Sequence, residues 1–264
     1  MKKVLPLLLM LLCINLPGLM AQQENDTEKK FGITFSGFVK NDFFFDSRQT
    51  VSAREGHFLL WPAAELPDAT GEDIHARSNF NFLAVQSRLS GKITGPDALG
   101  AKTAGVIEGD FFAQSNANIN LFRLRHAFIT LTWDQTKLLT GQYWNPLFVT
   151  GCFPGTVSFN TGTPLQSFAR NPQVRVTRTQ GNFQFIAAAL AQRDYTSRGP
   201  DPEDNSLTAV SSDYLRNAFL PDMHLQVHYQ QDPAENGTGF LAGVGAAYKV
   251  IAPRISSTVG GDTY

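Results

Sequence analysis

The sequence has few cysteines, few charged residues and, beyond its N-terminus, no long apolar run. Two cysteines, Cys13 and Cys152, cannot build a framework of disulfides. A charged fraction of 17% and a net charge of -1 provide no basic surface of the kind that binds nucleic acid. After residue 16, no apolar segment approaches the ~20 residues that a membrane helix needs. These absences argue against a disulfide-rich domain, a nucleic-acid-binding domain and a helical membrane protein.

The sequence is instead rich in phenylalanine, with 21 such residues and 42% hydrophobic residues in a chain of 264. This composition excludes intrinsic disorder. The mean hydropathy is nevertheless negative, at -0.15. Such a pairing is typical of a chain that alternates apolar and polar side chains.

The N-terminus has the layout of a secretory signal peptide. Lys2 and Lys3 precede an apolar run from Val4 to Leu16, and the small residue Ala21 follows at the expected cleavage site. We therefore expect a signal peptide over residues 1–21 and a short polar segment over residues 22–30. Removal of the leader leaves Cys152 alone, which excludes an intramolecular disulfide, and brings the net charge to -3.

Alternating hydrophobicity predicts nine β-strands in the remaining chain. The segment 222–230, DMHLQVHYQ, is the clearest, because Met223, Leu225 and Val227 alternate with polar residues. The first segment, FGITFSGFVKNDFFFD, places most of its phenylalanines opposite Lys40 and Asp42. The predicted strands are 31–46, 80–94, 101–114, 121–134, 137–144, 172–179, 182–192, 222–230 and 238–251.

The connections between these strands alternate in length. Long stretches at 47–79, 145–171 and 193–221 are separated by short turns rich in Gly, Asp, Asn and Pro. Outer-membrane barrels show this alternation, with short periplasmic turns and longer extracellular loops. A soluble sandwich with Greek-key links has no reason to do so.

The faces of the strands do not by themselves decide which solvent each face meets. A soluble barrel would turn its apolar face inward, and a membrane barrel would turn it toward lipid. The leader, the alternating connections and the aromatic residues near strand ends, such as Trp133 and Tyr143, favour the membrane. We therefore predict an all-β chain over residues 31–264, a transmembrane antiparallel up-and-down β-barrel in the outer membrane. The alternatives are a secreted soluble β-sandwich that binds a ligand, and a non-conducting receptor or adhesin barrel.

Nine strands is an odd number, whereas bacterial single-chain barrels have an even number. The last residues, APRISSTVGGDTY, do not resemble the final strand of a barrel. Residues 31–264 are thus expected to form an incomplete barrel, roughly half of one with 16–18 strands, the size that leaves an aqueous channel.

Several motifs resemble Gram-negative porins of the DcaP-like, dicarboxylate-channel type. In order they are QSRLSGKI, VIEGDFF, FRLRHAFITL, LLTGQYWNP and ARNPQVRVT, and the resemblance covers about Phe31 to Gln192. It implies a large antiparallel barrel, usually a homotrimer, that passes small hydrophilic and often anionic solutes. One departure is that no coiled-coil heptads precede the predicted barrel here.

Selectivity in a porin comes from pore diameter and from charges at the constriction. The candidate pore-lining residues are the charged or amide side chains of the polar faces: Arg88, Lys92, Glu108, Asp110, Arg123, Arg125, Gln142 and Arg175. Arg123 and Arg125 share a parity with Ile129, so they face the pore only if a bulge or a change of facing occurs near His126. The connection 145–171 is expected to fold into the lumen as a constriction loop. For any single pair, such as Arg88 with Glu108, a structural cross-strand pair is an equal alternative.

Enzymatic interpretations are not supported. His224 and His228 have a zinc-like spacing only on a helix, and on a strand they are ~13 Å apart. His75 and Ser78 lie near each other, but the surrounding residues do not match a phospholipase. No catalytic residue, metal or cofactor is predicted, and the expected partners are outer-membrane lipid and small hydrophilic solutes.

Overall fold

The computed structural model describes residues 31–112, 115–153, 168–194, 196–200, 206, 209–231, 239–256, 258–259 and 262–263. The predicted leader 1–21 and polar segment 22–30 lie outside the described residues. None of the helices in the described ranges is long and apolar enough to cross a membrane.

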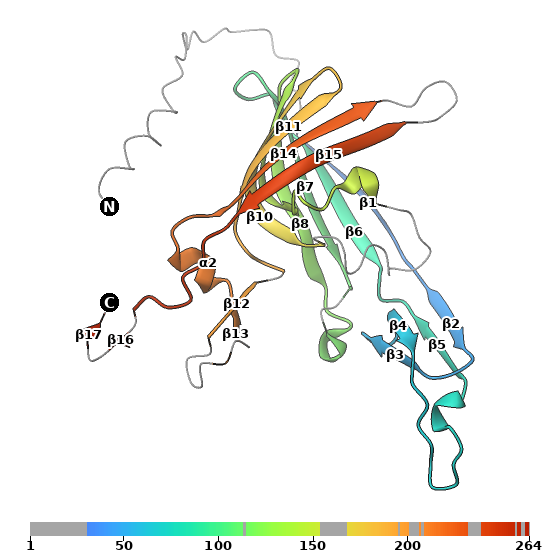
Figure 1. The fold of residues 1–264 in the computed structure, drawn as a ribbon. Coiled ribbons are helices and arrows are strands. Elements are labelled where there is room, and N and C mark those ends of the chain that lie inside the picture. Colours follow the sequence, from blue (N-terminus) through green and yellow to red (C-terminus); the bar gives the residue numbers. More distant parts are fainter. Residues whose placement is uncertain are drawn as a thin grey trace.

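One strongly curved antiparallel sheet dominates the molecule (Figure 1). Its nine strands follow one another in chain order, each paired with the next. They are β1 (Gly32–Phe38), β6 (Arg88–Thr94), β7 (Lys102–Asp110), β8 (Arg123–Thr132), β9 (Thr136–Trp144), β10 (Arg170–Gln180), β11 (Phe183–Leu190), β14 (Asp222–Gln231) and β15 (Phe240–Tyr248). Each of the nine predicted segments therefore contributes one strand to this sheet.

The connections alternate as the sequence predicts. Short connections join β6 to β7, β8 to β9 and β10 to β11 at the upper end of the sheet in Figure 1. The tightest is the two-residue turn after Gln180, in which Gly181 supplies a left-handed φ of 55°. The long connections gather at the opposite end. Hairpin pairing of neighbouring strands is thus repeated along the sheet, the meander expected of a barrel wall.

Two predicted strands are shorter than expected, because each breaks near the long-connection end. The segment 31–46 divides into β1 and β2 (Asp42–Asp46), and the segment 80–94 divides into β5 (Asn79–Leu83) and β6. At the break the amide of Lys40 donates to Ser87 Oγ at 3.3 Å, which replaces the regular ladder. β2 and β5 pair with each other as a separate two-stranded ribbon that extends from the main sheet (Figure 1).

The long connection 47–79 also has structure of its own. It contains the hairpin of β3 (Thr50–Ala53) and β4 (Phe58–Pro62) and a short 3-10 helix, η2 (Ile74–Ala76). The other small elements are η3 (Asn116–Asn118), η4 (Thr150–Cys152), β12 (Ser197–Gly199), β13 (Ala209–Ser211), α2 (Asp213–Asn217), β16 (Thr258–Val259) and β17 (Asp262–Thr263). These elements lie in the connections between the strands or after β15, and none of them adds a strand to the nine-stranded sheet.

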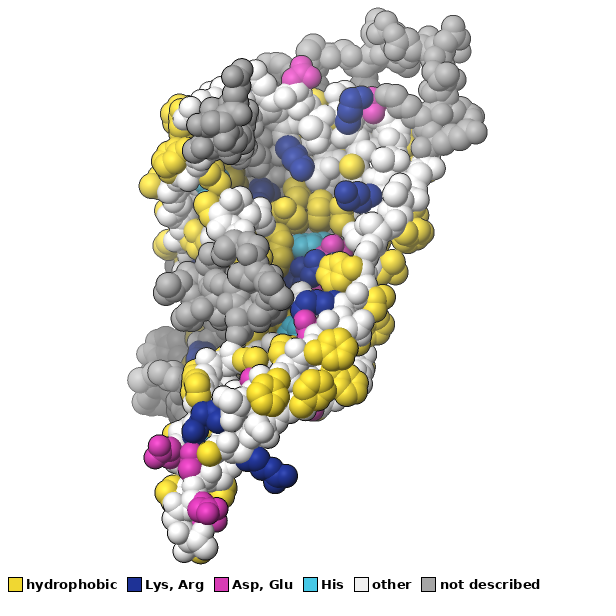
Figure 2. All heavy atoms as spheres, turned by 90° about the vertical axis from the view of Figure 1, so that its right-hand side faces the viewer, with side chains coloured by type: hydrophobic (Ala, Val, Ile, Leu, Met, Phe, Trp, Pro, Cys, Tyr) yellow, Lys and Arg dark blue, Asp and Glu magenta, His cyan; other side chains and the backbone are white. Residues whose placement is uncertain are grey.

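The two faces of the sheet have opposite chemistry. On β14, the side chains of His224, Gln226 and His228 are 2%, 4% and 8% exposed. The apolar residues between them are far more exposed, up to 66% at Leu225. Because polar side chains are buried and apolar ones exposed, the sheet is inverted relative to a soluble protein. Figure 2 looks into its hollow, where charged and histidine side chains gather. We call this side the inner face and the apolar side the outer face.

Candidate functional site: the charged inner face

The register of the strands determines which side chains share the inner face. Arg88 of β6 lies opposite Asp110 of β7, and Ser90 lies opposite Glu108. These residues alternate with Leu89 and Ile107, which are 52% and 53% exposed on the outer face. Strand alternation therefore places the acidic residues of β7 and the arginine of β6 on one wall.

A β-bulge brings both arginines of β8 to this wall. Glu108 pairs with His126, but Gly109 pairs with Leu124, so Arg125 is the extra residue of β8. The bulge shifts the alternation by one position, and Arg123 and Arg125 both reach the carboxylates of β7. The change of facing that the sequence requires near His126 is thus present, and its cause is a bulge.

Asp110 is the centre of the resulting ion-pair network. Its carboxylate is fully buried and accepts from Arg123 Nε at 2.9 Å and from Arg125 Nη1 at 3.0 Å. Arg88 Nη2 lies 3.6 Å away. Glu108 is the second acid, 2.7 Å from Arg125 Nε. Charge-assisted bonds of this kind fix the planar guanidinium groups in defined orientations.

Two arginines of β10 extend the row of positive charge. Arg170 is 3% exposed, and its Nη2 atom is 3.1 Å from Asp194, which follows β11. Arg175 donates from Nε to Gln173 Oε1 at 2.9 Å and from Nη2 to the carbonyl of Trp144. We call Arg88, Arg123, Arg125, Arg170 and Arg175 the arginine cluster. It faces three carboxylates, those of Glu108, Asp110 and Asp194, so it carries an excess of two positive charges.

Aromatic rings support these guanidinium groups. Trp144, at the end of β9, lies under both Arg125 and Arg170, with distances of 5.6 and 5.0 Å from each Cζ atom to the ring centroid. Tyr143 lies 5.2 Å from Arg175 in the same way. Cation–π contacts attract a guanidinium without neutralising it, so the cluster keeps its positive field.

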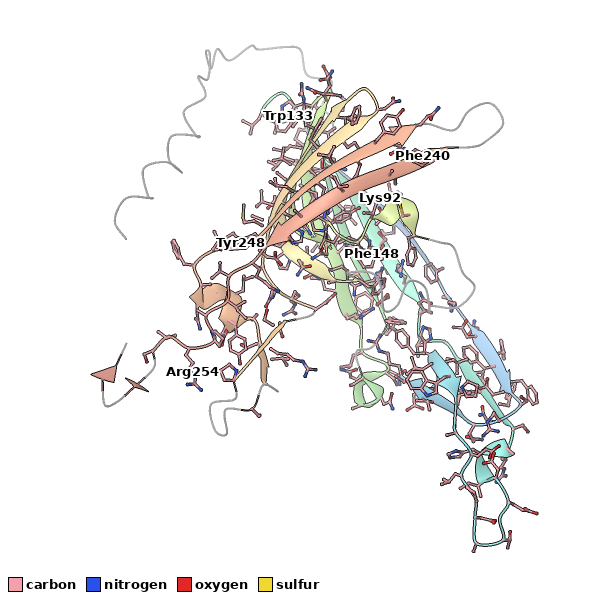
Figure 3. All side chains as sticks on the ribbon, viewed as in Figure 1. Lys92, Trp133, Phe148, Phe240, Tyr248 and Arg254 are labelled. Carbon is pink, nitrogen blue, oxygen red and sulfur yellow. The ribbon has the colours of Figure 1, made fainter. Side chains whose placement is uncertain are left out.

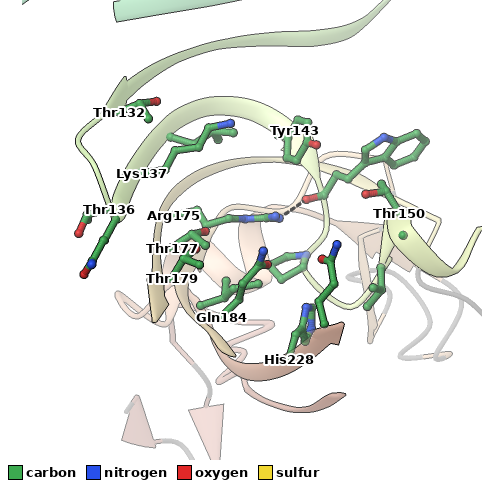
Figure 4. Close-up of a pocket in the computed structure, with 18 of the residues that line it drawn as sticks. Thr132, Thr136, Lys137, Tyr143, Thr150, Arg175, Thr177, Thr179, Gln184 and His228 are labelled. Atoms are coloured by element: carbon green, nitrogen blue, oxygen red, sulfur yellow. Dashed lines mark hydrogen bonds between the residues drawn. The ribbon is translucent and has the colours of Figure 1, made fainter. Parts of the chain in front are cut away.

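The connection after β9 turns onto the inner face as far as it is described. Phe148 packs against Trp144 at a centroid distance of 4.6 Å and is 4% exposed. This segment borders a recess of about 530 Å³ whose lining combines aromatic and aliphatic side chains with polar ones, among them Lys137, Arg175 and His228 (Figure 4). The predicted constriction loop 145–171 is therefore inside the curve of the sheet at residues 145–153, and residues 154–167 lie outside the described residues.

A second element reaches the arginine cluster from the connection between β1 and β6. His57, at the turn of the β3–β4 hairpin, is 3% exposed, and its Nδ1 atom is 4.0 Å from Asp42. Its ring lies 4.7 Å from that of Phe112, two residues after Asp110. Burial, assisted by the charge of Lys40, lowers the pKa of His57 to about 4. His57 is therefore neutral at pH 7.

The structure joins six of the eight sequence-predicted residues to this wall. Arg88, Glu108, Asp110, Arg123 and Arg125 form one network, and Arg175 belongs to the same row. Lys92 shares the inner register but is exposed, and no ion pair between described residues includes it. Gln142 pairs with Pro172 and Ala127, and its amide donates to the carbonyls of Leu124 and Arg125 at 3.4 and 3.0 Å. Its contacts are thus with the backbone of the bulge.

Sequence reasoning missed Arg170 and its partner Asp194. Arg170 has the parity of Val174, which lies on the outer face with 50% exposure, so alternation alone predicts that Arg170 faces outward. Its position depends on Asp194, 24 residues away in the next long connection. No local sequence pattern predicts this pairing, although Arg170 does belong to the motif ARNPQVRVT.

The histidines of β14 lie on a strand, as expected, and therefore do not have the helical geometry of a zinc pair. His224 Nε2 is 3.0 Å from Asp222. Across the part of the chain that the structure describes, no group of three or more His, Cys, Asp or Glu side chains could hold a metal ion.

Comparisons with known proteins bear on the fold. No protein-family model matches the sequence, and no curated protein matches it significantly. Among solved structures, the outer-membrane channel DcaP of Acinetobacter baumannii matches with a TM-score of 0.55 over 85% of this chain. The sequences are 19% identical, and the match covers 55% of the DcaP chain, so this chain spans about half the length of that protein. The resemblance to DcaP-like porins is thus confirmed at the level of the fold: over most of its length, the chain has the fold of about half of the DcaP outer-membrane channel.

Proposed function

We propose that the chain forms part of the wall of an outer-membrane porin through which small hydrophilic solutes, preferentially anions, diffuse passively. The observation that carries the proposal is the inverted polarity of the sheet. On β14 the buried residues are His224, Gln226 and His228, and the exposed ones are Met223, Leu225 and Val227. A soluble β-sandwich buries the apolar set. Lipid outside and water inside are the two solvents that stabilise this arrangement.

The aromatic residues at the strand ends agree with a membrane boundary. Phe240 and Tyr248 stand at opposite ends of β15 and are 58% and 63% exposed (Figure 3). Trp133 lies at the short-connection end of the sheet, where its indole N–H donates to the carbonyl of Leu99 at 3.0 Å. The amphipathic rings of Tyr248 and Trp133 are of the kind that favours membrane–water interfaces, and aromatic girdles flank the apolar band of outer-membrane barrels. The outer face of β15 is thus proposed to span the hydrocarbon layer between two such belts.

The arginine cluster supports a preference for anions. Its members occupy β6, β8 and β10, so they extend over about 19 Å of wall at ~4.8 Å per strand. The acids lie mainly on β7, between the arginines of β6 and β8. Interleaved charges of this kind create a local field that orients a dipolar solute, and the excess of guanidinium favours negative charge.

A water-filled pore needs about 16–18 strands, and the nine strands described here supply roughly half of that wall. The proposed pore therefore includes further strands beside β1 and β15. Assembly into a homotrimer, with the outer membrane as its location, belongs to the same proposal. Crosslinking of the detergent-extracted protein tests the trimer, since a ladder that ends at the monomer contradicts it.

Planar-bilayer recording tests the function directly. We expect discrete channels whose reversal potential in asymmetric KCl indicates a preference for chloride over potassium. Arg88→Ala removes one positive charge beside Asp110 and Glu108 and is expected to reduce that preference. Unchanged selectivity in this variant would remove Arg88 from the constriction. A complete absence of channels from the intact membrane protein would overturn the proposed function.

A receptor or adhesin role is the second candidate, because one long connection presents an unusual surface. The ribbon of β2 and β5 exposes Phe43, Phe45, Phe80 and Phe82, each at least 65% accessible. Exposed aromatic patches often mark interaction sites. Absence of conductance together with retained outer-membrane insertion would favour this role.

A further inference from the structure

The turn of the β3–β4 hairpin has an uncommon backbone. Arg54, Glu55 and Gly56 all have positive φ angles, of 56°, 57° and 85°. Glycine and asparagine adopt this left-handed region readily, but arginine and glutamate do so only at a steric cost. A tight hairpin with two such residues normally uses Asn-Gly or Asp-Gly. The contacts around the turn must therefore hold Arg54 in place.

Two amide side chains from different elements hold the turn. Asn81 of β5 donates from Nδ2 to the carbonyl of Glu55 at 2.6 Å. The amide of Glu55 donates to Oδ1 of Asn116, in η3 between β7 and β8, at 3.3 Å. The tip is thus fixed both to the β2–β5 ribbon and to the connection that follows Asp110, so it has a defined position on the inner side of the long-connection end.

The side chain of Arg54 is directed onto an aromatic ring that also binds the arginine cluster. Its Cζ atom lies 4.7 Å from the ring centroid of Phe112 and 4.6 Å from that of Phe58. Phe112 is 2% exposed and also contacts Arg123, at 4.7 Å. The backbone amide of Phe112 donates to Asp110 at 3.3 Å. One buried ring thus holds two guanidinium groups from segments about 70 residues apart.

Two guanidinium groups thus share the ring of Phe112, as Arg125 and Arg170 share that of Trp144. The quadrupole of the ring attracts both cations and leaves their net charge intact. The result is a row of positive charge that begins at the hairpin and continues through Arg123 to the rest of the arginine cluster.

We propose that Arg54 is a selectivity residue of the passage, which extends the arginine cluster to the mouth at the long-connection end and concentrates small anions there. This inference rests on the proposed porin function and adds a second charged element, on a loop and not on the wall. A charged mouth raises the local concentration of counter-ions, and the effect decreases with salt because the Debye length shortens from ~10 Å at 0.1 M to ~3 Å at 1 M.

Reversal potentials of the full protein in planar bilayers test the proposal. A unit charge ~8 Å from the path of a permeating monovalent ion changes the local concentration of that ion by about two-fold in water at low salt. Arg54→Gln is therefore expected to lower the chloride-to-potassium permeability ratio about four-fold in dilute KCl, because the local concentration of chloride falls and that of potassium rises by the same factor, and much less in 1 M KCl. Arg54→Lys, which keeps the charge, should retain most of the ratio. Arg77→Gln, an exposed arginine in the same connection, is the matched control and should change nothing.

Each outcome has one meaning. If the wild-type protein conducts and the Arg54→Gln variant has the same ion selectivity as the wild-type protein, the role of Arg54 is overturned while the porin function stands. If the wild-type protein does not conduct, the porin function itself fails. Should Arg54→Gln not assemble, Arg54→Cys in a Cys152→Ser background can be modified after assembly with a positively or a negatively charged thiol reagent. Opposite shifts of selectivity support the proposal, and equal shifts overturn it.

Discussion

Replacement of Asp110 by asparagine tests the ion-pair network most directly. Asp110 is fully buried and holds Arg123 and Arg125 at 2.9 and 3.0 Å, with Arg88 3.6 Å away. Asp110→Asn preserves the size of the side chain and removes its charge. Arg88 and Arg125 would then keep Glu108 as their acidic partner, and Arg123 would lose the carboxylate that it binds. Breaking a buried ion pair by removing one partner costs about 3–5 kcal/mol, because the remaining charge stays desolvated.

We expect Asp110→Asn to lower the free energy of unfolding by that amount, measured by urea titration in detergent micelles with heat-modifiable mobility as the readout of the folded barrel. A second substitution, Arg123→Gln in the same protein, removes one of the uncompensated charges. It should recover at least about 1 kcal/mol, which a double-mutant cycle quantifies.

Asp97→Asn is the matched control, because Asp97 pairs at 3.7 Å with Lys102 and both side chains are largely exposed. Surface pairs of this kind contribute about 0–1 kcal/mol. A loss below 1 kcal/mol for Asp110→Asn, equal to that of the control, would refute the interpretation of Asp110 as the centre of the network.

Three further predictions concern the hairpin, the two faces of the sheet and a glycine of β9. Burial holds the pKa of His57 at about 4 in the folded protein, against an ordinary 6.5, so the unfolded chain takes up the proton first as pH falls. The free energy of unfolding should therefore decrease by up to ~3 kcal/mol between pH 6.5 and 4, and in the His57→Gln variant the urea midpoint should change less with pH across that range. Val176→Lys on the outer face should reduce insertion into vesicles, at a cost of ~2–4 kcal/mol near the bilayer midplane, whereas Thr177→Lys on the inner face should insert normally; equal insertion would contradict the assignment of the faces. Gly141 has a φ of 124°, and a Cβ atom there would collide with the carbonyl oxygen of Ala127. Gly141→Ala should therefore yield less folded protein than Gly71→Ala, whose added Cβ atom meets open space; similar yields of the two variants on a heat-modifiability gel would contradict this.

The strand pattern of this fold could be predicted from the sequence because each strand is decided locally. Alternation over 222–230 predicts β14 almost residue for residue, since one face meets polar groups and the other does not. The breaks that create β2 and β5 could not be predicted in the same way. In FGITFSGFVKNDFFFD the same parity carries Phe35 before the break and Phe43 after it, and the break is marked by the contact of Lys40 with Ser87, 47 residues away.

The residues of the candidate site could likewise be predicted where strict alternation along a strand decides which side chains lie on the inner face. Arg88, Glu108 and Asp110 lie on the inner face for this reason, and a single bulge explains Arg123 and Arg125. The groups that were missed come from long connections. Arg54 and Asp194 reach the arginine cluster through tertiary contacts. Neither residue lies in a segment of alternating hydrophobicity from which its facing could be predicted.

The bulge at Arg125 also affects how this sequence can change over evolutionary time. A deletion of one residue in a regular strand exchanges the side chains of both faces from that point to the strand end. In β8 the bulge holds one residue, Arg125, that is extra to the pairing with β7, so loss of that residue exchanges no side chains between the faces. Deleting Arg125 would restore a regular ladder with β7, keep Ile129 and Leu131 on the outer face, and remove a single positive charge from the inner one. This position is therefore one where gain or loss of a codon could alter solute preference while the surface that contacts the membrane remains unchanged.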